Sequence, residues 1–384
     1  MSTSSIYTNP DAKSWIYTDN TDMAPIQAFH RRLQGYQETP LIPLPDLSKQ
    51  LGVNTIFVKD ESSRLSLPAF KILGASWGVV RAIIDLQTQN HTNSDPDPIP
   101  NSNSSLDEIA SAAQKAGTIL FAATEGNHGR AVARMGKLLS ILVRIFMSKF
   151  ADAWTIQKIE KEGASCGCDG SHDDAVAMAH RESQATPNNG LLVQDNAFEN
   201  YEQIPAWTVE GYSTLLFEVE DQLARQGLKA TAIVTPIGVG SLGHAAIAHC
   251  KSNRRYVKVL TVEPTTAACL YQNLQAGKWS PIPTSATIMN EMNCGTVSPI
   301  SWPVFEKGVD AAITVSDAEC HDAVQYLQRH GVNAGPCGAA ALAALRKAAA
   351  TDPEPAGLNN RDAVVVLLST EGKRDYVVPT YDKY

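Results

Sequence analysis

The chain has 384 residues, of which 43% are hydrophobic and 19% are charged. At roughly 150 residues per domain, this length predicts two or three domains with ample material for a buried core. The 32 Lys and Arg residues against 40 Asp and Glu give a net charge of −8, which is the wrong sign for a nucleic-acid or anionic-membrane surface. No apolar run approaches the roughly 18 residues of a membrane-spanning helix, and the first residues do not resemble a secretory signal.

The seven cysteines are odd in number and have no repeating spacing. A disulfide framework or a zinc site would need paired or clustered ligands, so reduced thiols are the simplest interpretation. We therefore expect a cytoplasmic protein that binds neither nucleic acid nor membrane.

Short β-branched runs alternate with helical patterns along the chain. Strands are predicted, in chain order, at residues 55–60, 118–123, 141–147, 191–195, 230–236, 257–262 and 363–369. Helices are predicted after the first three strands: one from about Lys71, one near Arg130, and one from about residue 152 to Gly163. This alternation predicts an α/β fold with open, mostly parallel twisted sheets flanked by helices.

A polar stretch at residues 88–107 interrupts this alternation. It is rich in Asn, Ser, Asp and Pro and has few groups to bury. Because a strand follows at residue 118, we interpret the stretch as an insertion within a domain, with a linker between domains as the alternative.

Three segments that follow strands and precede helices carry candidate chemistry, since open α/β sheets bind ligands there. In the first, Lys71 stands at the start of an apolar helix. The helix dipole disfavours a cation at this end, which makes the charge of the amine easier to lose. That suits a lysine that forms a Schiff base, because the neutral amine is the nucleophile. The alternative is an ordinary surface lysine.

The second segment is Glu125-Gly126-Asn127-His128-Gly129. Its two glycines allow the backbone to approach a ligand closely, and the helix that follows offers N–H groups to an anion. The alternative is a tight strand–helix turn with an Asx cap, with His128 in a structural role.

The third segment is a glycine-rich turn at residues 238–243, which is a natural phosphate cradle. Its glycine spacing also matches a dinucleotide fingerprint, and Glu263 follows at about the distance of the acidic residue in such a site. The spacing alone leaves both alternatives open. The Lys71 and Asn127 segments favour the phosphate cradle over the dinucleotide site, because a nicotinamide enzyme has no use for them.

Taken together, these segments resemble the pyridoxal-phosphate enzymes of fold type II, the tryptophan-synthase β-subunit type, and within them the diaminopropionate ammonia-lyase family. The resemblance covers roughly residues 35 to 375. It is carried by motifs at residues 59–74, 126–130, 193–195, 204–207, 211–215, 238–240, 262–264, 286–289, 294–295 and 368–372.

The resemblance implies pyridoxal 5′-phosphate as the cofactor and assigns roles to residues. Lys71 would hold the cofactor covalently, and Asn127 would hydrogen-bond the ring O3′. The phosphate loop would comprise Gly238, Val239, Gly240, Ser241 and Leu242. Ser369 or Thr370 would place a hydroxyl against the pyridine nitrogen. A neutral hydroxyl there favours β-elimination or β-replacement over transamination.

Two carboxylates complete the implied catalytic set with Lys71. Glu125 stands where the family has an aspartate, which together with the lysine allows both enantiomers of diaminopropionate to be used. Its side chain is one methylene longer, and a shift of about 1 Å can cost on the order of 100-fold in rate, which weakens the expectation that the D-isomer is used. Asp195 would be the general acid for the leaving group; the alternative is a strand-end cap.

Four other positions depart from the family pattern. They are Pro68, the run Pro336-Cys337-Gly338, the run 290–293, and the pair Lys373 and Arg374. These departures affect the expected substrate more than the expected cofactor.

The resemblance implies two domains with the cofactor in the cleft between them. The larger, cofactor-binding domain would comprise residues 1–75 and 196–384, and the smaller, mobile domain residues 76–195. The implied function is α,β-elimination on a small amino acid, most simply 2,3-diaminopropionate to pyruvate and ammonia, in a homodimer. The alternatives are a β-replacement synthase, a serine/threonine dehydratase-like enzyme and a non-catalytic binding protein.

A metal site is conceivable around Cys166, Cys168, His172, Asp173 and Asp174. We instead interpret Ser171 as the N-cap of a helix whose first turn is acidic, and we predict no metal.

Overall fold

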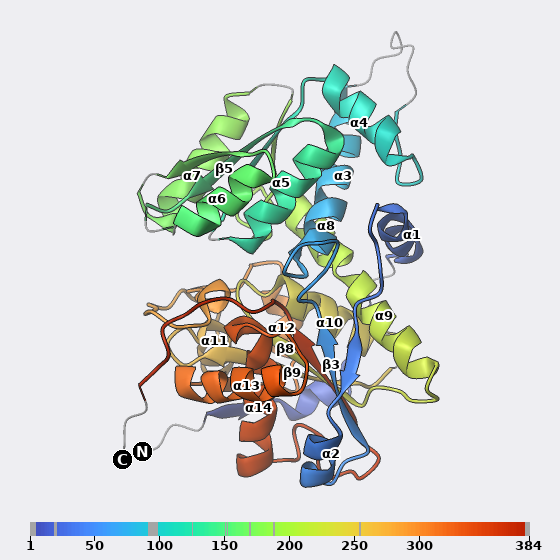
Figure 1. The fold of residues 1–384 in the computed structure, drawn as a ribbon, viewed down its shortest axis with the longest axis vertical. Coiled ribbons are helices and arrows are strands. Elements are labelled where there is room, and N and C mark those ends of the chain that lie inside the picture. The colour runs from blue at the N-terminus through green and yellow to red at the C-terminus, as the bar shows by residue number, and fades with distance from the viewer. Residues whose placement is uncertain are drawn as a thin grey trace. The chain divides into compact units, whose positions relative to one another are not determined.

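The structure is a computed structural model, shown in Figure 1. It describes residues 5–18, 21–90, 99–124, 126–149, 151, 153–168, 170–186, 189–252 and 255–380. Glu125 and residues 91–98 of the predicted polar insertion lie outside these ranges. The chain forms two compact units: unit 1 comprises Met1–Thr21, Gln37–Phe70 and Leu215–Tyr384, and unit 2 comprises Asp22–Tyr36 and Lys71–Thr214.

Unit 1 is built on a mixed sheet that is parallel in its interior. Within the described residues the sheet has seven strands in the order β1-β10-β9-β8-β11-β3-β2, and only the pairings of β1 and β2 at the two edges are antiparallel. The strands are β1 (Ile6–Thr8), β2 (Leu41–Pro43), β3 (Thr55–Asp60), β8 (Ala232–Pro236), β9 (Lys258–Pro264), β10 (Ala311–Val315) and β11 (Val364–Ser369). The central strands β8, β10 and β11 are buried at every position, as parallel strands covered on both faces must be.

Helices cover this sheet. They are α2 (Pro45–Leu51), α9 (Ser213–Ala224), α10 (Ser241–Lys251), α11 (Cys269–Ala276), α12 (Trp302–Gly308), α13 (Asp317–Arg329) and α14 (Pro336–Thr351), with short 3₁₀ turns η1 (Pro10–Lys13) and η2 (Asn290–Met292). The alanine-rich α14 packs on β8, β9, β10 and β11, and its small side chains join the buried core of the unit. α9 starts at the last two residues of unit 2.

A buried network of charges links β3 to α9 within unit 1. Lys59 Nζ lies 2.6 Å from Glu218 Oε2, and Arg64 pairs with both Glu61 and Glu218 at 2.6 Å. All four side chains are almost fully buried, and such charges are tolerated only when they are paired and hydrogen-bonded. Two residues of the Lys-Asp-Glu-Ser motif at residues 59–62, Lys59 and Glu61, therefore have a structural role as members of this buried network.

Unit 2 contains a parallel sheet with the strand order β6-β5-β4-β7. Its strands are β4 (Ile119–Ala123), β5 (Leu142–Met147), β6 (Ser165–Cys168) and β7 (Gly190–Leu192), and its helices are α1 (Ala24–Arg32), α3 (Lys71–Asn90), α4 (Leu106–Lys115), α5 (Asn127–Leu139), α6 (Ala153–Lys161), α7 (His172–Gln184) and α8 (Gln203–Gly211). On one face, Phe121 and Phe146 pack with Ala175 and Ala179 of α7. On the other face, the glycines of α5 lie against Val143 and Ile145.

The α/β architecture with mostly parallel sheets flanked by helices is confirmed. Several expected boundaries differ. α3 continues to Asn90 and α4 begins at Leu106, so helices occupy both ends of the stretch predicted as a polar insertion. The strand predicted to run to Asp195 ends at Leu192. Residues 71–75 and 196–214 belong to unit 2, because α3 is one continuous helix and α8 packs along it.

No helix in the described part of the chain is both long enough and apolar enough to cross a bilayer.

Candidate active site

The predicted lysine begins α3 and forms an ion pair with the predicted aspartate. Lys71 Nζ donates to Asp195 Oδ2 across 2.5 Å, and both side chains are largely buried, with exposed fractions of 17% and 15%. Both residues belong to unit 2. The structure thus brings together two side chains that are 124 positions apart in the sequence.

The ion pair controls the ionisation of the aspartate. Burial would raise the pKa of Asp195, but the ammonium of Lys71, the nearby His128 ring and the hydrogen bond from Lys71 outweigh it and hold the pKa well below its usual range. His128 Nε2 lies 2.9 Å from the Val193 carbonyl oxygen, and its Nδ1 lies 3.9 Å from Asp195 Oδ2. His128 therefore bridges α5 to the segment that carries Asp195.

The loop between β4 and α5 is capped by a residue that sequence reasoning missed. Thr124 Oγ1 accepts hydrogen bonds from Gly126 N at 3.0 Å and Gly129 N at 3.1 Å. The Asx cap considered above is therefore wrong: the N-cap is Gly126 and Asn127 is the first helical residue. A threonine two residues before Gly126 is the sequence signal for such a cap. Glu125 lies outside the described residues, and its predicted role stays a prediction.

The glycine-rich turn lies in unit 1 between β8 and α10. Gly240 is the N-cap of α10 with φ +98°, and a Cβ there would lie 2.6 Å from the Phe305 ring. Because the N-cap has no side chain, nothing of its own covers the N–H groups of the first turn, which is the arrangement that receives an anion. Ser298 N donates to Val239 O at 2.8 Å and fixes the turn from the other side. Ser241 and Leu242 are buried in the first turn of α10.

Ser369 ends the central strand β11 with a hydroxyl that is fully buried. Within the described residues, Ser369 Oγ has no hydrogen-bond partner, and a buried polar atom without a partner calls for a ligand or a water molecule. A Cβ at Gly338 would lie 2.8 Å from this oxygen, so any larger residue at this position would crowd the hydroxyl. The Thr370 carbonyl accepts a bond from Phe70 N at 3.4 Å, and Phe70 directly precedes Lys71.

Three of the four departures from the family pattern lie around this strand end and the glycine turn. Pro336 occupies the first turn of α14, where its missing N–H costs nothing, and Cys337 N donates to Glu371 Oε1 at 3.0 Å. Glu371 Oε1 also pairs with Arg374 Nε at 3.3 Å. The carbonyl of Glu291 lies 2.8 Å from the Cβ position of Gly238.

Glu263 does not have the environment of a nucleotide-binding carboxylate. It is 1% exposed, and its two oxygens accept hydrogen bonds from Leu270 N at 2.8 Å and Tyr271 N at 2.7 Å, at the start of α11. Both oxygens are therefore committed to the protein, which removes the support that Glu263 gave to the dinucleotide alternative.

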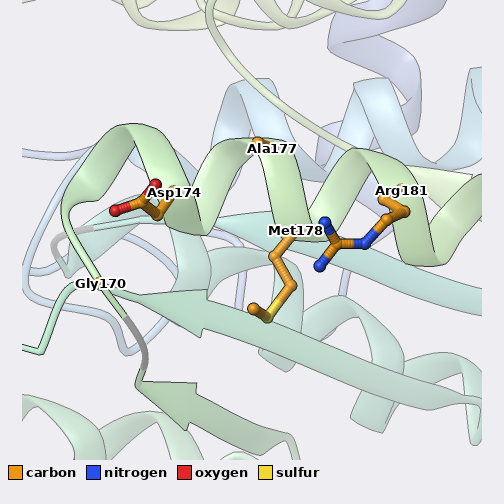
Figure 2. Close-up of a pocket in the computed structure, with 5 residues that line it drawn as sticks. All are labelled: Gly170, Asp174, Ala177, Met178 and Arg181. Carbon is orange, nitrogen blue, oxygen red and sulfur yellow. The ribbon is translucent and has the colours of Figure 1, made fainter.

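The stretch considered as a metal site runs from β6, which contains Cys166 and Cys168, into the start of α7. Ser171 forms a capping box with Asp174, so the predicted N-cap is confirmed. A cavity of about 290 Å³ lies beside this helix, lined by Gly170, Asp174, Ala177, Met178 and Arg181 (Figure 2). None of its lining residues belongs to the predicted catalytic or cofactor-binding set.

These residues fit pyridoxal phosphate. Lys71 supplies an amine in a mostly buried position, the glycine turn before α10 supplies N–H groups for a phosphate, and Ser369 supplies an unpartnered neutral hydroxyl suited to a ring nitrogen. The fit rests on the chemistry of the donors within each unit.

Comparison with known proteins agrees with this chemistry. The family model described as "Pyridoxal-phosphate dependent enzyme" matches residues 32–370. The diaminopropionate ammonia-lyase of Salmonella typhimurium is 34% identical over 299 residues, covering 76% of this chain and 72% of the relative. The Escherichia coli diaminopropionate ammonia-lyase is 30% identical over 366 residues, covering 90% of this chain and 87% of the relative.

Solved structures match equally broadly. The crystal structure of the Escherichia coli lyase in complex with an aminoacrylate-PLP azomethine reaction intermediate matches with a TM-score of 0.80 and 28% identity, covering 96% of this chain and 93% of that chain. Maize serine racemase matches with a TM-score of 0.71 and 21% identity over 93% of this chain and 95% of that chain, which shows the shared fold. The protein therefore belongs to the diaminopropionate ammonia-lyase family of pyridoxal-phosphate dependent enzymes.

Proposed function

We propose that this protein eliminates ammonia from 2,3-diaminopropionate, giving pyruvate and a second ammonia after hydrolysis. The proposal is supported by family membership and, above all, by the Lys71–Asp195 pair, which places an amine and a carboxylate 2.5 Å apart. Lys71, Asn127, Gly238, Val239, Gly240, Ser241, Leu242, and Ser369 or Thr370 are the proposed cofactor ligands. Bound pyridoxal phosphate supplies the electron sink for charge that develops at the substrate α-carbon.

The two side chains of the pair have complementary tasks in the proposed reaction. Lys71 Nζ accepts the α-proton, and Asp195 Oδ2 returns a proton to the departing β-nitrogen. The charge of Lys71 is the largest of the influences that lower the pKa of Asp195. Once the amine is neutral, burial is the dominant influence that remains, and it raises the pKa of the carboxyl so that it can hold a proton. Glu125 is the proposed base for the opposite enantiomer.

The test is Lys71→Ala in the cofactor-loaded protein. We expect loss of the visible absorbance of the bound cofactor and a fall in pyruvate formation of about 1,000-fold or more, because the variant lacks both the covalent anchor and the base. Lys49→Ala, an exposed lysine of α2, is the matched control and should behave as wild type. A coloured and fully active Lys71→Ala variant would contradict the proposal.

The same assay separates the substrates. Pyruvate formed from diaminopropionate without an added amine or thiol supports elimination, whereas product formed only with such an acceptor supports β-replacement. Serine as the preferred substrate would support a dehydratase-like activity. Assays with separate D- and L-isomers test the role proposed for Glu125. The homodimer and the cytoplasmic location remain proposals from the sequence.

A further inference from the structure

The chain leaves the sheet of unit 2 three residues before Asp195. β7 ends at Leu192, and Val193 N still donates to Phe121 O of β4 at 2.7 Å. Beyond this point the backbone is no longer part of a strand, which lets Asp195 turn to Lys71. The position of the carboxyl therefore depends on what holds the residues between the strand and the aspartate.

One hydroxyl spans the point where the chain leaves the sheet. Tyr201 Oη accepts a hydrogen bond from Gln194 N at 2.9 Å and donates one to Leu192 O at 2.7 Å. A single side chain thus satisfies a backbone donor and a backbone acceptor on either side of Val193. Burial raises the pKa of Tyr201, so the hydroxyl keeps the proton that it donates.

A tight turn brings Tyr201 back to this segment. Phe198 and Tyr201 form an antiparallel bridge in which Tyr201 N donates to Phe198 O at 2.8 Å. Asn200 lies between them with φ +63°, a conformation that asparagine adopts more readily than most residues. The two rings stack with centroids 4.7 Å apart, and His180 of α7 lies edge-on to Phe198 at 5.2 Å. The turn and α7 together fix the position of the hydroxyl.

Two further side chains hold the same segment. Gln194 is buried, and its Oε1 accepts a hydrogen bond at 2.9 Å from the N–H of Ala123, the last residue of β4. His128 Nε2 lies 2.9 Å from Val193 O. Side chains thus take over at the end of the sheet, and every residue in this arrangement belongs to unit 2.

We propose that Tyr201 is a positioning residue for Asp195, whose hydroxyl ties Leu192 O to Gln194 N and so sets where the carboxyl stands when it protonates the leaving group. The inference rests on the proposed function. In that step the Cβ–N bond breaks, the electron pair stays on nitrogen, and the proton of Asp195 forms the new N–H bond. A general acid must lie within hydrogen-bond reach of the atom it protonates, and a shift of about 1 Å can cost on the order of 100-fold in rate.

The test compares two leaving groups in the cofactor-loaded enzyme. Ammonia leaving from diaminopropionate takes the proton of Asp195, whereas chloride leaving from β-chloroalanine takes none. Tyr201→Phe keeps the stacked ring and removes only the hydroxyl. We expect kcat for diaminopropionate to fall about tenfold, kcat for β-chloroalanine to change less than about twofold, and KM to stay within about twofold for both. A general loss of folded enzyme would lower both rates equally.

Two other variants frame this result. Asp195→Asn removes the acid itself and should show the same dependence on the leaving group with a larger loss. Gln194→Met keeps the length of the side chain and removes the acceptor for Ala123 N, so it should change the two rates in the same direction as Tyr201→Phe. Tyr326→Phe, on α13 in unit 1, is the matched control and should equal wild type with both substrates.

Amide hydrogen exchange provides a readout that needs no substrate. The Gln194 N–H is bonded to the Tyr201 hydroxyl, so its exchange should be about tenfold faster in Tyr201→Phe. The amides of β4 should exchange as in wild type.

The proposal would be overturned by a Tyr201→Phe enzyme with the wild-type rate on diaminopropionate. Equal losses on both substrates, while Asp195→Asn loses only on diaminopropionate, would also overturn it. If Asp195→Asn itself loses equally on both, or if wild type forms no pyruvate from either, the proposed function is wrong. The exchange of the Gln194 amide would then still decide whether Tyr201 holds the segment that carries Asp195.

Discussion

The charge of Lys71 influences the ionisation of Asp195, the residue proposed as the proton donor. Lys71 and Asp195 are 2.5 Å apart, and the pKa of the carboxyl is low because its partner is positive. A cofactor or substrate that neutralises Lys71 removes the largest influence that lowers this pKa, so burial, which raises it, is less opposed. The geometry thus couples the charge of Lys71 to the pKa of Asp195.

Asp195→Asn tests this coupling. The amide fills the same space but cannot donate an acidic proton, so we expect kcat for diaminopropionate to fall by about 100-fold or more with little change in KM. In the cofactor-free protein, the depressed carboxyl pKa contributes stability above the unfolded value of 3.8, and this contribution is lost as the pH falls through the folded value. Urea unfolding should therefore show wild type more stable than the variant near pH 7, with the difference shrinking below about pH 4.

Asp46→Asn is the matched control, since the side chain of Asp46 is 86% exposed. It should change neither rate nor stability appreciably. An Asp195→Asn variant with wild-type kcat would remove Asp195 from the mechanism and leave it as a structural partner of Lys71.

Glu263 makes the free energy of unfolding depend on pH with the opposite sign to Asp195. Burial raises its pKa to about 7, although the N–H groups of Leu270 and Tyr271 oppose the rise. A raised folded pKa stabilises the protein below the unfolded value of 4.5 and loses that contribution as the pH rises through about 7. We expect wild type to lose up to about 3 kcal/mol of unfolding free energy between pH 5 and pH 8.5 through this group.

Glu263→Gln keeps an acceptor oxygen and cannot ionise, so its unfolding free energy should change less over the same pH range. Chemical denaturation at a series of pH values measures both proteins directly. Parallel pH profiles for wild type and variant would show that the carboxyl is already ionised at pH 5.

At the scale of elements, the sequence pattern predicts several strands correctly but does not predict the geometry of the turns. The run at residues 55–60 is β3 with both ends as predicted, because a β-branched run bounded by polar residues has few alternatives. β10, at Ala311–Val315, was not predicted, since two of its five residues are alanine and carry little strand signal. The cap at Thr124 forms because its hydroxyl lies within hydrogen-bond distance of the N–H groups of Gly126 and Gly129. A sequence pattern does not specify such distances.

The turn before α10 combines backbone strain with close packing at Gly240. Its φ of +98° is unfavourable for other residues, and a Cβ would contact Phe305 at 2.6 Å. We expect Gly240→Ala to weaken pyridoxal phosphate binding by at least tenfold and to lower the unfolding free energy by about 2–3 kcal/mol. Cofactor titration by absorbance and urea unfolding measure the two effects.

Gly277→Ala separates the two causes, because Gly277 has φ +61° and no atom within 4 Å of its Cβ position. This substitution should lower the unfolding free energy only by the conformational cost of about 1 kcal/mol and leave cofactor binding unchanged. Equal effects of the two substitutions would mean that packing against Phe305 contributes nothing.

At the scale of the whole molecule, the sequence predicts the fold class and identifies the candidate cofactor ligands. It does not predict which segments of the chain belong to which unit. α1 joins unit 2 through His30, and residues 196–214 do so through the close contact of α8 with α3. Both depend on contacts between segments that are distant in sequence. Local periodicity contains no information about such contacts. The family resemblance does relate distant segments, because its motifs recur in a fixed order along the chain.

The proposed cofactor ligands come from both units, and this has a measurable consequence. Lys71 and Asn127 belong to unit 2, whereas the turn at residues 238–242 and Ser369 belong to unit 1. A ligand that binds the folded state stabilises the regions that it contacts, by mass action. Removing the cofactor with a carbonyl reagent such as hydroxylamine should therefore speed amide hydrogen exchange in α5 and in α10 alike, and adding pyridoxal phosphate back should slow it in both.

Peptides from α13, which carries no proposed ligand, serve as the internal control and should exchange at the same rate in both states. In Lys71→Ala the slowing should need a higher concentration of pyridoxal phosphate, because the covalent anchor is gone while the phosphate turn remains. Slowing confined to α10 would mean that the cofactor is held by unit 1 alone. That result would remove Lys71 and Asn127 from the binding set, and with them the structural argument for elimination at this site.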